Sequence, residues 1–142
     1  MNTDTEFERA RDAFVKGIAA LEDGNLLEAE EQLLLSLALL PGRKSTLVNL
    51  SSTSLLLGKV NEAIGYAEQA IALDPTDIKS IDQLVVILLR IKNFERALSV
   101  LEHVKELASD EMGTSFFLPQ AVALQGVGRL DEALASCRRA VE

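Results

Sequence analysis

The chain has 142 residues, of which 48% are hydrophobic and 25% are charged, and its formal net charge is -8. This size and composition suit one domain with an apolar core and exclude a disordered low-complexity segment. An acidic chain repels phosphate groups, so we expect neither a nucleic-acid partner nor a membrane partner. A single cysteine and an acidic N-terminus without an apolar run lead us to expect a cytoplasmic protein.

Apolar residues recur with helical spacing along the whole chain, between short turns. The pattern predicts eight helices, at about 5–23, 26–40, 44–57, 60–73, 78–91, 94–108, 114–127 and 130–142. The apolar run 84–89 would also suit a buried strand, but its place in the repeat described next favours a helix. Pro119 lies inside the seventh predicted helix, so that helix either begins near Leu118 or is kinked there.

The same small residues return at a fixed interval. Gly24 and Gly58 are 34 residues apart, as are Pro41 and Pro75. Four alanines near the starts of second helices keep the spacing, with two extra residues before the last: Ala29, Ala63, Ala97 and Ala133. A period of this size indicates stacked helical hairpins. We place four repeats, at about 10–43, 44–77, 78–111 and 114–142, in a single domain over residues 1–142.

The small residues also predict how the two helices of each hairpin meet. Antiparallel helices in a short hairpin touch where their side chains are small, so we expect the four alanines at the crossings. Gly17 and Ser51 supply small residues on the first helices of the first two repeats. The third repeat is the least regular, because Val85 stands at the small position and Lys92 replaces the turn glycine.

The first two repeats resemble the tetratricopeptide repeat. The residues that carry the resemblance are Gly24, Ala29 and Pro41, followed by Gly58, Ala63, Ala70 and Pro75. The resemblance implies an all-α, right-handed α-solenoid of about four helical hairpins. It also implies that the first helices line a concave groove, which in this family usually takes an extended or helical peptide. We therefore expect a protein–protein interaction scaffold, although a fold alone names no partner.

Groove positions were assigned residue by residue from this resemblance. The main set is Phe14, Ile18, Val48, Asn49, Ser52, Lys79, Gln83, Val86, Leu89 and Arg90. We call the groove-facing sides of the first helices the groove rows. They also contain Leu21, Leu55, Asp82, Leu118, Val122 and Gln125. One subclass of the family holds acidic C-terminal tails with lysines, an arginine and asparagines. Only Asn49 and Lys79 match that clamp, so we expect an apolar or amphipathic segment as the partner.

The fifth predicted helix is the strongest reason to expect binding. It is apolar on almost every side, and such a helix should be buried all round. The first helix of a hairpin must nevertheless show one side to the groove. Val86 and Leu89 lie on that side and are expected to anchor a partner. Lys79, Gln83 and Arg90 are expected to form a polar rim around them.

No set of residues points to catalysis, so we expect no enzyme, no cofactor and no metal site. His103 is expected on a solvated surface, and Cys137 is expected to be a small core residue four positions after Ala133. One histidine and one cysteine cannot build a zinc site of the usual kind. An alternative function is the N-terminal accessory arm of a larger enzyme, similar to the repeats that precede O-GlcNAc-transferase-like glycosyltransferase domains.

The last predicted helix carries an apolar stripe. Its members are Leu130, Leu134, Cys137 and Val141, at helical spacing. We expect part of the stripe to pack on the seventh helix. No further repeat follows in this sequence to cover the rest, so we expect that the chain either is a fragment of a longer protein or forms a homodimer through the C-terminal hairpin.

Overall fold

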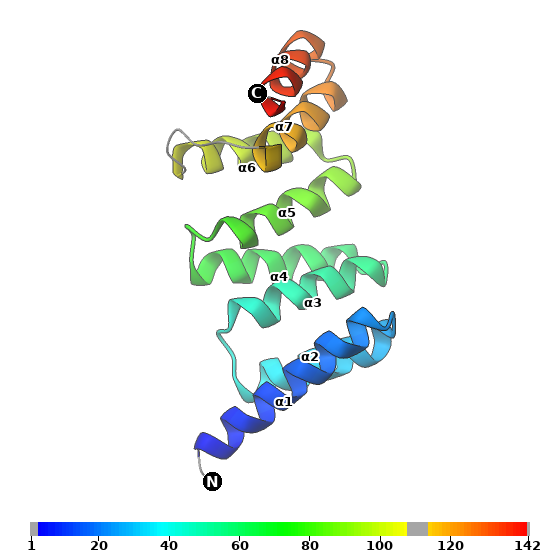
Figure 1. Cartoon of the computed structure of the whole chain (residues 1–142), viewed down its shortest axis with the longest axis vertical. Coiled ribbons are helices and arrows are strands. Elements are labelled where there is room, and N and C mark those ends of the chain that lie inside the picture. Colours follow the sequence, from blue (N-terminus) through cyan, green and yellow to red (C-terminus); the bar gives the residue numbers. More distant parts are fainter. Residues whose placement is uncertain (1–2, 108–113, 142) are drawn as a thin grey trace. The chain divides into compact units, whose positions relative to one another are not determined.

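The computed structural model describes residues 3–107 and 114–141, and in these residues the chain is entirely helical apart from its turns (Figure 1). The helices are α1 (Thr3–Glu22), α2 (Leu26–Leu39), α3 (Lys44–Leu56), α4 (Val60–Leu73), α5 (Ile78–Arg90), α6 (Phe94–Leu107), α7 (Thr114–Gly126) and α8 (Leu130–Ala140). The run at 84–89 is helical, as the repeat predicted. The all-α fold class is therefore confirmed, and the described helix ends lie within about two residues of those expected.

The chain divides into two compact units, Met1–Gln83 and Leu84–Glu142, and each is described by itself. In the first unit α1 packs on α2, α3 packs on α4, and α2 also packs on α3. In the second unit α7 packs on α8, and α6 packs on α7. The helix α5 begins in the first unit and ends in the second. The single domain and the right-handed twist of the whole stack stay predictions.

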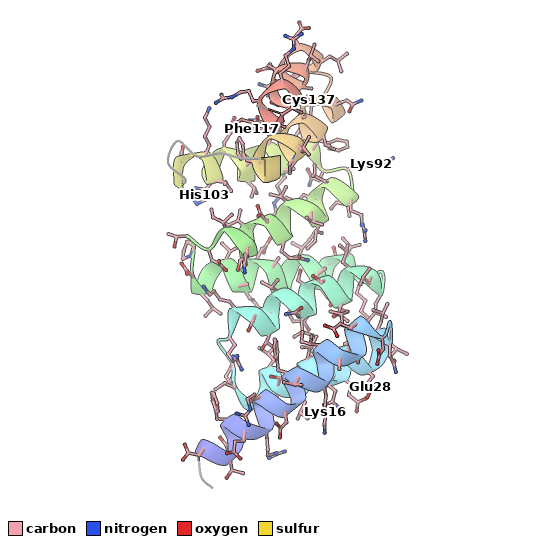
Figure 2. The ribbon with its side chains drawn as sticks, in the orientation of Figure 1. Lys16, Glu28, Lys92, His103, Phe117 and Cys137 are labelled. Atoms are coloured by element: carbon pink, nitrogen blue, oxygen red, sulfur yellow. The ribbon has the colours of Figure 1, made fainter. Side chains whose placement is uncertain are left out.

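Each hairpin turn contains one residue in the left-handed conformation. It is a glycine in three turns, with φ of 78° at Gly24, 80° at Gly58 and 84° at Gly128. In the third hairpin it is Lys92, with φ of 62° (Figure 2). The next residue in every turn donates its backbone N–H to a carbonyl five residues earlier, at 2.8 or 2.9 Å. This helix-ending pattern requires the left-handed residue, which explains why the turn glycine marks the period.

Replacing Lys92 with glycine is expected to stabilise the protein by about 0.5–1 kcal/mol. A side chain in the left-handed region costs about 1–2 kcal/mol, and the extra freedom of glycine in the unfolded chain cancels part of the gain. Urea unfolding followed by circular dichroism would measure the difference. The reverse change in the second hairpin, Gly58→Lys, should destabilise. A Lys92→Gly variant less stable than the parent would show that the lysine contributes contacts of its own.

The crossings of the hairpins are as tight as the sequence predicted. Ala29, Ala63 and Ala97 are completely buried, and Ala133 is buried to within a few per cent of its surface. In the first hairpin Gly17 lies so close to α2 that a Cβ atom there would be 2.8 Å from Cγ of Leu33. The burial of the four alanines and the close approach at Gly17 agree with the role predicted for small residues at the crossings.

Two exposed ion pairs connect segments of the first unit. Lys59 Nζ lies 2.8 Å from a carboxylate oxygen of Glu30, and Lys44 Nζ lies 3.0 Å from Oδ2 of Asp74. The hydrogen bond from Lys44, followed by those from Thr76, lowers the pKa of Asp74 from 3.8 to about 2. All of these groups are reached by solvent, so screening keeps their contribution to stability small.

The seventh helix begins before its proline, which corrects the alternative start near Leu118. α7 runs from Thr114 to Gly126 with Pro119 inside it. Phe116 and Phe117 are both buried, and their rings meet edge to face with centroids 5.1 Å apart. Burying two phenylalanines contributes about 3–6 kcal/mol, more than the roughly 3 kcal/mol that a proline inside a helix costs.

The last helix turns a different side inward from the one expected. Cys137 is exposed (Figure 2), so the expectation of a core cysteine is wrong. The buried side of α8 carries Ala133 and Ser136, and Ser136 Oγ donates a hydrogen bond to Oε1 of Gln120 on α7 at 2.8 Å. The inner side therefore continues three residues after Ala133 instead of four, which leaves Cys137 outside. The other residues of the apolar stripe, Leu130, Leu134 and Val141, are exposed as well. The expectation that part of the stripe packs on α7 stays a prediction.

Candidate functional site

The groove positions of the first unit lie on the partly open sides of α1, α3 and α5. We call them the first-helix surface: Phe14, Ile18, Val48, Asn49, Ser52, Lys79 and Gln83. Lys79 is exposed and the other six are half-buried. None of them belongs to the buried core, so each has side-chain surface that another molecule could contact.

The helix α3 has a sharp difference between its two sides. Its buried residues are Thr46, Leu47, Leu50, Ser51, Thr53 and Ser54, whereas Val48, Asn49 and Ser52 are half-open. Asn49 Nδ2 donates a hydrogen bond to the Ser45 carbonyl of the same helix at 2.8 Å. This bond holds the amide in place and leaves its oxygen and one N–H available. A peptide backbone needs that pair of groups, one acceptor and one donor.

A short chain of hydrogen bonds connects Gln83, near the middle of α5, to α3 and α4. Gln83 Nε2 donates to Ser51 Oγ at 3.4 Å, and Ser51 Oγ donates to the Ala63 carbonyl at 2.7 Å. Ser51 is completely buried, and its small side chain lets the helices approach. The side chain of Gln83 therefore already has one hydrogen-bond partner within the fold. Fewer of its hydrogen-bonding groups are available to a partner than the sequence suggested.

The aromatic side chain of the surface is partly covered by a neighbouring cation. The Arg43 guanidinium carbon lies 5.4 Å from the centroid of the Phe14 ring. A cation at this distance is attracted to the ring face. The contact places a positive charge beside the apolar positions of α1.

Asp82 lies on α5 beside Gln83 of the first-helix surface, and the sequence did not reveal its importance. It is half-buried, and burial raises the pKa of its carboxyl group. Among the described residues, none donates a hydrogen bond to the Asp82 carboxyl group and none forms an ion pair with it. An unpaired carboxylate out of full solvent favours binding of a cation or a hydrogen-bond donor. Its place in the groove row beside Gln83 was the only sequence signal.

The same side of α5 continues with apolar residues. Val86 is 50% exposed, whereas Val85 is 2% exposed and Ile87 is fully buried. Leu89 is half-buried and Arg90 is exposed. On α7, three positions of the groove rows are exposed: Leu118, Val122 and Gln125. Val86 is thus the exposed residue between two buried neighbours in the apolar run of α5.

The described residues include no obvious chemical centre. Residues 3–107 and 114–141 contain no cluster of three or more histidine, cysteine or acidic side chains that could hold a metal ion. His103 is exposed on α6 (Figure 2), and Oε2 of Glu106 lies 4.0 Å from its Nδ1. Within the described part of the chain, no helix has both the length and the apolar character needed to cross a bilayer.

Comparisons with known proteins agree with these features. Residues 45–77, which include most of α3 and all of α4, match the family model described as tetratricopeptide repeat. No curated protein matches the sequence. Three solved structures illustrate the fold. MamA 41-end from Desulfovibrio magneticus RS-1 has a TM-score of 0.83 and 21% identity, over 94% of this chain and 74% of that one.

The other two are also repeat proteins. TTC0263, a thermophilic TPR protein in Thermus thermophilus, has a TM-score of 0.76 and 21% identity, over 93% of this chain and 73% of its own. YrrB, described as a TPR protein with an unusual peptide-binding site, has a TM-score of 0.78 and 18% identity, over 93% of this chain and 67% of its own. At such low identity the likeness shows the fold alone.

Proposed function

Because the chain carries a tetratricopeptide repeat at residues 45–77 and has the fold of tetratricopeptide-repeat proteins, we propose that it is a protein–protein interaction scaffold. Its partner would be an apolar or amphipathic peptide segment bound by the first helices of the hairpins. The observation that carries this proposal is the half-exposed Val86 in a helix whose other central apolar residues are buried. The peptide-binding site ascribed to YrrB supports the same class of function.

The contacts divide into anchoring and orienting groups. Val86, Val48 and Ile18 offer apolar surface, and burying such side chains supplies most of the binding free energy at an interface. Asn49, held by the Ser45 carbonyl, can pair with the backbone of a peptide of almost any sequence. Asp82 would select a segment that carries a basic or donor group near its apolar residues.

This assignment disfavours an acidic-tail clamp. Such a clamp needs several cations facing a carboxylate, whereas an unpaired Asp82 next to Lys79 would repel one. A scaffold of this kind needs no cofactor and no catalytic residue. It would work in the cytoplasm, where Cys137 stays reduced.

A peptide selection would test the proposal. Short random peptides displayed on phage would be selected on the wild-type chain, and their affinities measured by fluorescence anisotropy. We expect Val86→Asp to weaken binding at least about tenfold, because an anchor is replaced by a charge. Asn49→Ala should weaken it by a smaller factor. Both variants should keep the parent's melting temperature, since neither side chain is in the core.

Two control variants separate this surface from the rest of the chain. Leu27→Asp makes the same kind of change at an exposed leucine of α2, and His103→Ala removes an exposed side chain of α6. Both should bind the selected peptides as the parent does. A folded Val86→Asp chain with full affinity would end the proposal for α5. An unfolded one would mean that Val86 stabilises the fold instead of binding.

A further inference from the structure

The helix α8 presents an uncovered apolar stripe. Leu130 is 63% exposed, Leu134 is 52% exposed, and Cys137 and Val141 are exposed as well. The buried residues Ala133 and Ser136 lie on an adjacent side of the helix, about 100° around its axis from the stripe, and α8 packs on α7. The stripe shares no residue with the buried side of α8 or with the first-helix surface. Contiguous exposed apolar side chains of this kind usually mark an interaction site.

The spacing of the stripe defines the geometry of the partner. The four residues follow one another at intervals of four, three and four positions. This is the alternation of the a and d positions of a heptad, with Leu134 and Val141 at a and Leu130 and Cys137 at d. Such a seam packs against another helix at a shallow angle, with side chains interdigitating. The expected partner surface is therefore a second helix with a similar seam.

The charges beside the stripe select a second copy of this chain. Asp131 and Arg138 directly follow the two d residues, so both occupy e positions at the edge of the seam. The other two charged residues of α8, Glu132 and Arg139, already have partners within the same chain. Glu132 accepts two hydrogen bonds from Arg129, at 2.5 and 2.7 Å, and the Arg139 guanidinium lies 4.7 Å from the Phe117 ring centroid.

Asp131 and Arg138 have no ion-pair partner among the described residues. One is acidic near the start of the helix and the other is basic near its end. When two copies of α8 run antiparallel, e positions face e positions, and each Asp131 meets Arg138 of the partner subunit. A parallel pair would place Arg138 beside Ala133 of the partner subunit and would leave Asp131 without a facing residue on α8, so it would gain no ion pair. The antiparallel pair also sets opposite helix dipoles side by side.

We propose that the chain forms a homodimer through antiparallel packing of α8 on α8 about a two-fold axis. Leu134 of each copy packs against Cys137 of the partner subunit, and Leu130 packs against Val141 of the partner subunit. Two symmetric ion pairs, each between Asp131 and Arg138 of the partner subunit, lie at the edge of the apolar seam. This proposal does not depend on peptide binding, because the first-helix surface takes no part in it.

The dimer can be tested on the full chain by sedimentation equilibrium over a wide range of concentration. The wild-type chain should sediment as a reversible dimer. Leu134→Glu should raise the dimer dissociation constant at least about a hundredfold, because the symmetric interface loses two leucines and gains two charges. The substituted leucine is half exposed, so the melting temperature should not fall. Leu27→Glu, at an exposed leucine of α2, is the matched control and should leave the dimer intact.

Charge reversal tests the antiparallel arrangement itself. Asp131→Arg and Arg138→Asp should each weaken the dimer by roughly three- to tenfold, and the double exchange should restore it. The chain has one cysteine, so a short bismaleimide should join only Cys137 to Cys137, across the two-fold axis. A wild-type chain that stays monomeric at every concentration would overturn the proposal. A double exchange that fails to restore the dimer would overturn the antiparallel pairing.

Discussion

Replacing Ala63 with leucine is expected to lower the free energy of unfolding by about 1–3 kcal/mol. Ala63 is completely buried where α4 crosses α3, and its carbonyl accepts the Ser51 hydrogen bond at 2.7 Å. A leucine there has no free volume to fill, so the two helices must separate and the hydrogen bond must lengthen. Urea unfolding followed by circular dichroism would report the loss.

The same substitution at an exposed site of the same helix provides the control. Ala72 lies on α4 and is exposed, so Ala72→Leu should change stability by no more than about 0.5 kcal/mol. The comparison cancels the difference in helix propensity between alanine and leucine. If both variants were equally stable, Ala63 would not be a contact between the helices, and the alignment of the repeats would have to shift.

Two glycine-to-alanine substitutions are expected to have opposite effects. Gly17→Ala should destabilise by about 1–2 kcal/mol, because the new Cβ would lie 2.8 Å from Cγ of Leu33, which is fully buried and has no room to move. Gly65→Ala should stabilise by about 0.5–1 kcal/mol. It lies inside α4, nothing is within 4 Å of the added Cβ, and alanine favours the helix.

Thermal and urea unfolding of the two variants would measure both effects. Each substitution adds one methyl group to a helical residue, so the difference between them isolates the space available. A Gly17→Ala chain as stable as the Gly65→Ala chain would mean that α1 and α2 can separate at little cost. It would also remove the reason for a small residue at this point of the repeat.

The repeat and its hairpins could be predicted from residues that recur at fixed spacing. The repeat length, the turn and the helix crossing are all local properties of one hairpin. Each therefore places a particular residue type at a fixed position in every repeat. The left-handed turn residue favours glycine, and the close crossing demands alanine. Lys92 shows the strength of this constraint, because it adopts the left-handed conformation that its place in the period requires. Helix bounds and the burial of the four alanines could be predicted for the same reason.

The choice of face was decided only by the tertiary structure. One residue turns an α-helix by about 100°, so a step of three and a step of four from Ala133 reach different sides. The hydrogen bond between Ser136 and Gln120 selects the step of three on α8 and leaves Cys137 outside. In the same way, packing of the two phenylalanines starts α7 before Pro119, although the proline suggested a later start.

For the candidate site too, some features could be predicted from the sequence and others depended on tertiary contacts. The groove rows followed from the repeat, and the main set named from them lies on open or half-open surface. Three facts depended on neighbours that are distant in the sequence: Ser51 engages Gln83, Asp82 has no partner among the described residues, and Val86 is half exposed. Burial and pairing are properties of the assembled helices, whereas sequence spacing specifies only which residues share a side of one helix.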